Sequence, residues 1–312
     1  MIGACNARGL GHTMDDLARE HPSRRDFLRS AGTAASVLAV SHFSGFNLLG
    51  ESEADQTTAR SAPGFRPLFD GVSLKGWTRQ IREPLRPGLG IWTVQNGMIV
   101  GGQDSPTIGS YLVSDETFSD FELMLEARPD WRADTGVLVR TNAQGNVGFQ
   151  NCIDYRPHGA LVGYYGNNLG GFHACDYCFT GKLNRDGQLE RLIPEKPSEP
   201  LDATHNVRLD YAIPASGFLS IWKLHGWNHF RIRSVGAVPR LTTWINGVKV
   251  AELDTAKVKS PDWDPGSVEH LVGRAGHISL EVHSNRPTDW LGKDRWAPGA
   301  VCRWRNISIK TL

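Results

Sequence analysis

The sequence predicts an all-β fold, a jelly-roll or lectin-like sandwich of two antiparallel sheets. From Phe65 onward, short segments alternate between apolar and polar residues, which is the period of a half-buried strand. The 34 glycines and 17 prolines occur in short clusters between these segments, as turns would. No convincing helical period is found, so the connections do not suit a parallel α/β architecture.

The expected strands follow one another at short intervals along the chain. Between two of them, Asn246-Gly247 predicts a type I′ hairpin, because both central residues of that turn need positive φ. The segment 156–201 has few alternations, and a connection of that length usually carries function or is disordered. The strands are expected at residues 92–95, 98–100, 111–113, 121–128, 137–140, 149–154, 230–233, 242–245, 249–251, 277–283 and 301–310.

The N-terminal segment has the pattern of a twin-arginine export signal. Arg24 and Arg25 precede a run of small and apolar residues at 31–49. A short surface helix that begins with two arginines is the alternative interpretation. The run is too short and too polar to predict a membrane span.

The residues after this run set the expected domain boundaries. Residues 52–54 have the small-x-small form of a peptidase site, so residues 1–54 are expected to be the signal peptide. A polar linker at 55–64 and one domain at 65–312 would follow. The mature protein is expected in the periplasm or outside the cell, without membrane attachment.

The charge balance favours a neutral partner. The chain has 34 basic and 33 acidic residues and a formal net charge of +1, so no general positive field attracts nucleic acid or an anionic membrane. Its 10 Trp, 6 Tyr and 12 Phe can fill a sandwich core and also stack on flat apolar faces such as those of sugars.

A series of motifs along the whole expected domain resembles one known family. The first is Phe-Asp-Gly-Val-Ser-Leu-Lys-Gly-Trp at 69–77, and further matches lie at 92–97, 120–123, 135–140, 159–164, 230–232, 244–248, 276–283 and 305–310. Together they resemble the 3-keto-disaccharide hydrolase family, formerly a domain of unknown function. The resemblance implies a concanavalin A-like fold and action on glycosides oxidised at the third sugar carbon, by hydrolysis or by elimination and hydration.

Five polar residues are candidates for this chemistry, which needs a base, a stabiliser for the enolate and an acid for the leaving oxygen. Asp154 shares a strand face with Gln150, and Arg140 ends a neighbouring strand. His283 shares a face with Glu281. We expect Asp154, His283 and Arg140 to be catalytic and Gln150 and Glu281 to bind substrate. A structural Asp–Arg pair and a solvated face around the histidine are the alternatives.

The position of Gln150 departs from the family pattern. The family commonly has Glu-x-Gln-Ile on its central strand, whereas this chain has Gln-Asn-Cys-Ile at 150–153. An amide therefore replaces a usual carboxylate. This departure favours a non-catalytic, lectin-like carbohydrate-binding domain as the alternative to an enzyme.

Three aromatic residues are candidates for stacking on a sugar ring. Tyr164 and Tyr165 are flanked by Gly163 and Gly166, and a glycine-rich loop can present rings to solvent. Trp92 is a further candidate. Most tryptophans in a sandwich belong to its core, which is the alternative for each of these rings.

A short Cys-rich segment offers candidate metal ligands. His173, Cys175 and Cys178 could hold a divalent metal such as zinc through one imidazole and two thiolates. In an oxidising compartment, the two cysteines could instead form a disulfide with each other or with Cys152 or Cys302. Free thiols are the third alternative.

These observations leave several functions open. The leading hypothesis is an exported enzyme that cleaves 3-keto glycosides, with a carbohydrate substrate and no nucleic-acid partner. The main alternative is a non-catalytic carbohydrate-binding domain, because the same fold and aromatic residues would serve it equally well. A secreted scaffold that binds protein is a third possibility.

Overall fold

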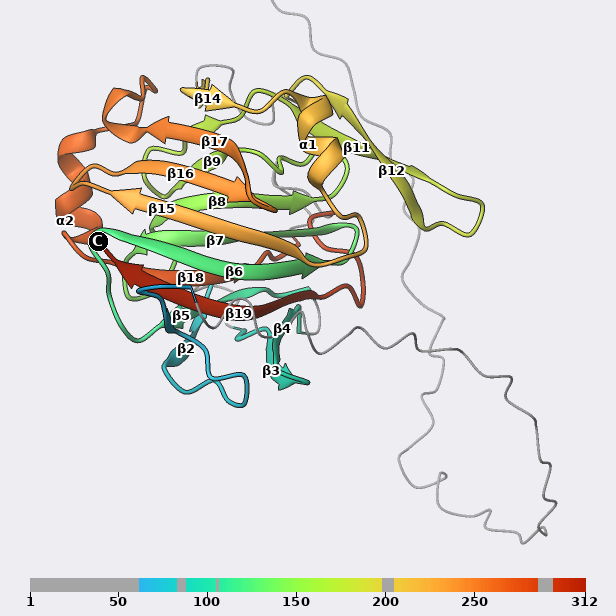
Figure 1. The fold of residues 1–312 in the computed structure, drawn as a ribbon, viewed down its shortest axis with the longest axis horizontal. Helices are drawn as coiled ribbons and strands as arrows, with labels where there is room; N and C mark the ends of the chain where they lie inside the picture. Colours follow the sequence, from blue (N-terminus) through green and yellow to red (C-terminus); the bar gives the residue numbers. More distant parts are fainter. Residues whose placement is uncertain (1–61, 83–87, 105–106, 198–204, 286–293) are drawn as a thin grey trace, which may run out of the picture. The chain divides into compact units, whose positions relative to one another are not determined.

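The computed structural model describes residues 62–82, 88–104, 107–197, 205–285 and 294–312. The expected signal peptide at 1–54 and most of the expected linker lie outside these residues. Two large sheets pack face to face in the described part of the chain (Figure 1). No helix found there has the length and apolar character needed to cross a membrane.

The first sheet, called sheet A, follows the order β14-β17-β16-β15-β6-β19-β4-β3, and β1 also pairs with β19. All its pairs are antiparallel. Its strands are β1 Arg66–Pro67, β3 Ile91–Gln95, β4 Met98–Gly102, β6 Phe121–Pro129, β14 Tyr211–Ala212, β15 Asn228–Val235, β16 Arg240–Ile245, β17 Val248–Asp254 and β19 Cys302–Thr311.

The second sheet, called sheet B, follows the order β13-β10-β9-β8-β7-β18-β5-β2. Its pairs are antiparallel except for β10 with β13, which is parallel. Its strands are β2 Trp77–Ile81, β5 Ser110–Ser114, β7 Ala133–Thr141, β8 Gly148–Tyr155, β9 Tyr164–Asn167, β10 His173–Ala174, β13 Asn206–Val207 and β18 His277–Val282.

The core lies between the two sheets because each contributes one apolar face. On β6, Leu123 and Leu125 are fully buried in this core, and on β18 so are Ile278 and Leu280. Side chains alternate along a strand, so the residues between them project from the opposite faces of the sheets. The predicted class, an all-β jelly-roll sandwich of two antiparallel sheets, is confirmed.

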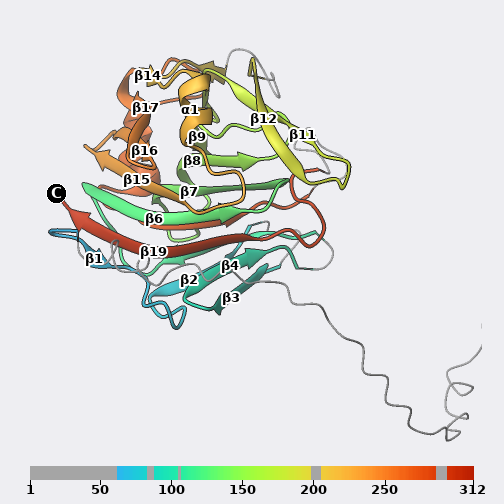
Figure 2. The ribbon, with the colours of Figure 1, turned by 45° about the vertical axis from the view of Figure 1, so that its right-hand side comes forward.

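The remaining elements lie at the ends of the sandwich. A separate hairpin of β11 Cys178–Leu183 and β12 Leu189–Glu195 projects beyond the two sheets (Figure 2). The described residues form two short α-helices, α1 Ala215–Ile221 and α2 Val268–Val272, and 3-10 turns at Thr255–Lys257 and Pro265–Ser267.

Two sequence expectations need correction. The sequence shows no helix, yet α1 forms at one end of the sandwich, where Phe218 is fully buried and stacks on Trp222 with ring centroids 5.4 Å apart. One or two helical turns are too short to produce a recognisable apolar period. The segment 156–201 is also more regular than its composition indicates, since it contains β9, β10, β11 and β12.

The predicted hairpin at Asn246-Gly247 is confirmed. It joins β16 to β17, with Ile245 opposite Val248. Both turn residues have positive φ, 50° at Asn246 and 85° at Gly247, as a type I′ turn requires.

Candidate functional site

The face of sheet B that points away from the core carries a group of buried and partly buried polar side chains. An outer sheet face is normally solvated, but here Glu281 is only 1 % exposed, and Asp134 and His283 are also buried. Buried charges must be paired, and they are uncommon away from functional sites. We call this group the sheet B cluster: Arg82, Asp134, Gln150, Asp154, Arg156, Glu281, His283 and Arg295.

Strand register brings the acidic members together. Asp134 on β7 lies directly opposite Asp154 on β8. On the other side of β7, the His283 N–H donates to the Asp134 carbonyl oxygen at 3.4 Å, which places this histidine just beyond the end of β18. Alternation along β18 puts Glu281 on the same face as His283. Three adjacent strands therefore supply the acidic members of the cluster.

Two arginines hold the aspartate pair. Arg295 Nη1 lies 2.8 Å from Asp134 Oδ2 and 3.5 Å from Asp154 Oδ2. Arg156 Nε lies 2.9 Å from Asp154 Oδ1 and 3.9 Å from Asp134 Oδ2. Each guanidinium thus contacts both carboxylates, which offsets the repulsion between them.

Asp154 has an acid–base character suited to neutral pH. Burial and the neighbouring Asp134 carboxylate raise the pKa of Asp154 to about 7, although Arg156 and Arg295 act in the opposite direction. A group with a pKa near 7 can both accept and donate a proton at neutral pH. Asp154 is therefore the strongest general acid–base candidate in the cluster.

The imidazole ring of His283 is neutral, and a hydrogen bond fixes its orientation. Burial lowers its pKa well below the ordinary value, and the positive charges of Arg82 and Arg295 add to this effect. Its Nδ1 lies 2.7 Å from the Ser284 carbonyl oxygen, so Nδ1 carries the proton and donates it there. Nε2, which is 4.0 Å from Asp134 Oδ2, is left with a lone pair that can accept a hydrogen bond.

Glu281 forms a second centre with Arg82 and Gln150. Its carboxylate pairs with the Arg82 guanidinium, and Gln150 Nε2 donates to Glu281 Oε2 at 2.6 Å. The Gln150 side chain can cross β7 to reach Glu281 because the β7 residue beside it, Gly136, has no side chain. A Cβ atom on that glycine would lie 2.5 Å from Gln150 Nε2. The amide that departs from the family pattern is thus a donor to a buried carboxylate.

Gln150→Glu is expected to make stability more sensitive to pH. The new carboxylate would face Glu281 at hydrogen-bond distance, so its pKa in the folded state would rise above that in the unfolded state. A raised folded-state pKa means that stability falls as pH rises from about 4 toward that pKa. Urea unfolding at pH 5 and pH 8 should show an additional loss of roughly 2 kcal/mol at pH 8 relative to wild type.

Gln150→Met is the matched control for this substitution, because it removes the amide without adding a charge. Its change in stability should be the same at both pH values. An equal pH dependence in the Glu and Met variants would contradict the close contact with Glu281.

Two further side chains extend the cluster across β9 and β10. Tyr165 lies opposite Gln150 and is partly exposed, and its ring centroid is 6.2 Å from that of His173. Burial lowers the pKa of His173 to about 4, so this ring is neutral at physiological pH. Tyr165 thus stands on strand β9 beside the charged residues, and its stacking on a sugar stays a prediction.

Arg140 is not part of this site, and the prediction that it lies near Asp154 is wrong. It stands six residues beyond Asp134 on β7 and is fully buried. Its guanidinium donates to the carbonyl oxygens of Gly273 at 2.8 Å and Gly236 at 3.1 Å. Its positive φ of 53° and the register shift opposite it explain why simple alternation misplaces the side chain.

Tyr164 and Trp92 are core residues, so their predicted exposure to a sugar is wrong. Tyr164 is fully buried on the inner face of sheet B, and its hydroxyl donates to the Ala251 carbonyl oxygen at 3.2 Å. Trp92 is 4 % exposed and stacks on Trp304, with ring centroids 5.6 Å apart.

The predicted metal ligands do not form a metal site. Cys175 Sγ lies 3.8 Å from His173 Nδ1, and Cys175 also packs with Cys178 and Cys152 in one small buried cluster. Among the residues that the structure describes, no three His, Cys, Asp or Glu side chains form a group that could hold a metal ion. No disulfide joins the four described cysteines either. The expected divalent metal stays a prediction without a ligand set.

Four members of the cluster were missed by sequence reasoning. Asp134 precedes the predicted strand by only three residues, and alternation from Gly136 could have placed it on the outer face. Arg82 and Arg295 lie in connections far from Glu281 and Asp134 in the sequence, and only the fold brings them to these carboxylates. Arg156 follows Asp154 by two residues, so this spacing could have indicated their contact.

Fold and site together define a β-sandwich domain with a buried acid–base cluster on one sheet face. The model of the 3-keto-alpha-glucoside-1,2-lyase-like domain matches residues 64–310, and the chain belongs to this family. No curated protein matches the chain at a significant level.

Several solved structures are similar to this chain at a distance. A candidate glycosyl hydrolase from Parabacteroides distasonis is 16 % identical, with 80 % of this chain and 94 % of that chain covered and a TM-score of 0.43. A carbohydrate-binding module from Bacillus subtilis, CBM66, is 12 % identical, with 76 % and 96 % covered and a TM-score of 0.36. At such low sequence identity, conclusions about function depend on the residues of this chain.

Proposed function

We propose that this protein cleaves glycosides oxidised at the third sugar carbon, by elimination followed by hydration. The observation that carries the proposal is Asp154, a partly buried carboxyl with a pKa of about 7 between two arginines. Membership of the family supports the substrate class. The proton beside a ketone is acidic enough for a carboxylate to remove it with such help.

The first step uses Asp154 as the base. Its carboxylate takes the proton from the second sugar carbon, and the C–H electron pair forms a double bond to the third carbon while the ketone becomes an enolate oxygen. Positive charge from Arg295 and Arg156 beside Asp154 stabilises the developing negative charge. Both arginines are largely buried, so their charges are weakly screened.

The second step breaks the glycosidic bond. The enolate re-forms the ketone, its electrons make a double bond between the first and second carbons, and the glycosidic oxygen leaves. Asp154, now protonated, can return its proton to that oxygen. Water then adds to the first carbon while the second regains a proton. His283 Nε2 and the Glu281 carboxylate would accept hydrogen bonds from sugar hydroxyls.

A direct assay tests the proposal. The purified domain is incubated with a 3-keto glycoside of a chromogenic alcohol and with the same glycoside before oxidation. Release of the alcohol from the keto form alone is expected, and release from neither form would overturn the proposal. Running the assay with and without chelator tests the predicted divalent metal.

A non-catalytic carbohydrate-binding role is the second candidate. Gln150 favours it, because an amide occupies the place of a family carboxylate and donates to Glu281 instead. The same assay distinguishes the two functions, since a binding domain would retain the keto glycoside unchanged. Saturable binding without release of the alcohol would support this second function.

Export through the twin-arginine route is part of the proposal. It rests on Arg24 and Arg25 before the small-residue run, which lie outside the described residues. Replacing both with lysine is expected to retain the precursor inside the cell, as measured by immunoblots of cell fractions. The single substitution Arg19→Lys, at an arginine that precedes the motif, is the control. Undiminished export of the double variant would exclude this route.

A further inference from the structure

Two separate segments bring side chains to the sheet B cluster from the same side of β7. β18 pairs with β7, and just beyond its end the His283 N–H donates to the Asp134 carbonyl oxygen. Toward the start of β7, residues 132–134 pair with residues 295–297 instead, and the Asp134 N–H donates to the Arg295 carbonyl oxygen at 2.9 Å. His283 and Arg295 therefore reach the cluster on different segments.

The side chain of Asn285 joins these two segments. Its Nδ2 donates to the Trp296 carbonyl oxygen at 2.9 Å, and its Oδ1 accepts the Trp296 N–H at 2.8 Å. One amide thus makes the pair of bonds that two backbones exchange in an antiparallel ladder. Both residues are buried, where hydrogen bonds are stronger than in water. Since Trp296 directly follows Arg295, these bonds fix the arginine's segment relative to that of Asn285.

The segment that carries Asn285 is also held by the connection between β4 and β5. Gln103 Nε2 donates to the His283 carbonyl oxygen at 2.6 Å. The Asn285 N–H donates to the Thr107 carbonyl oxygen at 3.1 Å. The backbone of Asn285 therefore has a fixed position, which its side chain passes on to the second segment.

Both segments place a side chain at the same carboxylate oxygen. Asp134 Oδ2 is 2.8 Å from Arg295 Nη1 and 4.0 Å from His283 Nε2. Arg295 Nη1 also lies 3.5 Å from Asp154 Oδ2. Among the charged and titratable groups around Asp154, Arg295 alone is carried by residues 295–297. The others are Asp134 on β7, Cys152 on β8, Arg156 after β8, Glu281 on β18 and His283 after β18.

We propose that Asn285 is a positioning residue that holds Arg295 beside Asp154. Its role in catalysis rests on the proposed function, which makes Asp154 the base. Without the two bonds to Trp296, only the backbone pairing with β7 and its own ion pairs would hold Arg295. Its guanidinium would then spend less time beside Asp154. Because Arg295 lowers the pKa of Asp154, that pKa would rise.

The pH dependence of kcat/KM tests this role, since it reports the pKa of the base in the free enzyme. Asn285→Ala is expected to raise the midpoint of the profile by about one pH unit. Arg295→Gln should raise it at least as far. The double variant should go no further than Arg295→Gln alone, because both changes act through one guanidinium. Asn285→Ser can make at most one of the two bonds and should give a smaller rise, so it serves if Asn285→Ala does not fold.

Asn228→Ala is the matched control for Asn285→Ala. The Asn228 amide makes the same pair of bonds with one backbone residue, donating to the Lys223 carbonyl oxygen at 3.0 Å and accepting the Lys223 N–H at 2.9 Å. It stands at the start of β15 in sheet A, outside the sheet B cluster. Its loss should lower stability and leave the midpoint unchanged, which separates positioning from a general loss of structure.

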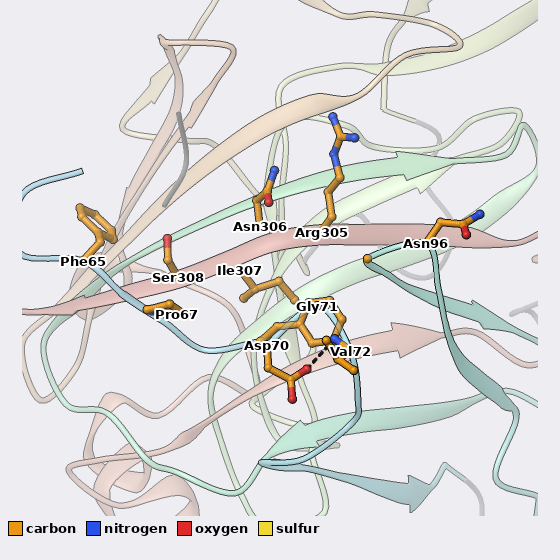
Figure 3. Close-up of a pocket in the computed structure, with 12 residues that line it drawn as sticks. Phe65, Pro67, Asp70, Gly71, Val72, Asn96, Arg305, Asn306, Ile307 and Ser308 are labelled. Atoms are coloured by element: carbon orange, nitrogen blue, oxygen red, sulfur yellow. Dashed lines mark hydrogen bonds between the residues drawn. The ribbon is translucent and has the colours of Figure 1, made fainter. Parts of the chain in front are cut away.

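Arg305→Gln is the matched control for Arg295→Gln. The Arg305 side chain is 12 % exposed, against 13 % for Arg295, and it also pairs with a carboxylate, that of Glu126. It projects from β19 of sheet A, as Figure 3 shows. The midpoint should therefore stay at the wild-type value in this variant.

NMR titration of the ¹³C-labelled Asp154 carboxyl, assigned by its absence in Asp154→Asn, measures the same midpoint without turnover. A wild-type chain that releases no alcohol would overturn the proposed function, and this titration would still test the contact. A midpoint raised in Asn285→Ala and Arg295→Gln but not in the two controls supports the role of Asn285. An unchanged midpoint in Asn285→Ala, or additive rises in the double variant, would contradict it.

Discussion

Asp154→Asn is expected to lower turnover of a 3-keto glycoside by about 10²–10⁴-fold, the usual contribution of a general acid–base group. The amide keeps the size of the side chain but can neither take the sugar proton nor return it. Because burial and Asp134 raise the pKa of Asp154 to about 7, wild-type kcat/KM should rise as pH increases through 7, where the carboxylate forms. Steady-state kinetics from pH 5 to pH 9 measure both effects.

Asp130→Asn is the matched control for Asp154→Asn. Asp130 accepts a hydrogen bond from Arg303 Nη1 at 2.7 Å, so its substitution also removes a carboxylate from an ion pair, but outside the sheet B cluster. It should leave turnover within a factor of a few. Full turnover in Asp154→Asn, or equal losses in the two variants, would contradict the assignment of the base.

The fold class and part of the site follow directly from alternation. The period of two along 277–283 separates Ile278 and Leu280 from Glu281 and His283, and the structure buries the first pair in the core and the second on the opposite face. The same argument groups Gln150 with Asp154. These residues stand on regular strands, where sequence position determines the direction of the side chain.

The wrong site predictions arise where this regularity ends. Arg140 follows alternation in the sequence, but its positive φ and the neighbouring register shift redirect it, and no residue pattern signals either feature. Tyr164 and Tyr165 both lie between glycines, and only the pairing of β9 with β8 decides that Tyr164 faces the core. Arg82 and Arg295 contact carboxylates that are more than a hundred residues away in the sequence, so no local residue pattern predicts these contacts.

The structure gives Arg140 a structural role instead of a catalytic one. Its two terminal nitrogens donate to backbone carbonyl oxygens in three separate connections. The acceptors are Ser119 before β6, Gly236 and Ala237 after β15, and Gly273 after α2. None of these acceptors belongs to the sheet B cluster. One buried charged group therefore joins three separate connections by hydrogen bonds to their backbone.

Arg140→Met is expected to lower the free energy of unfolding by roughly 3 kcal/mol, because the shorter apolar side chain loses the charged hydrogen bonds to Gly236 and Gly273 that join their connections. Urea unfolding measures this loss. Arg185→Met is the control, since Arg185 is exposed in the β11–β12 hairpin, and its effect should stay within about 0.5 kcal/mol. Under conditions where Arg140→Met remains folded, kcat should equal that of wild type, because the guanidinium acts on the scaffold alone. A folded, stable variant with greatly reduced kcat would restore Arg140 to the chemistry.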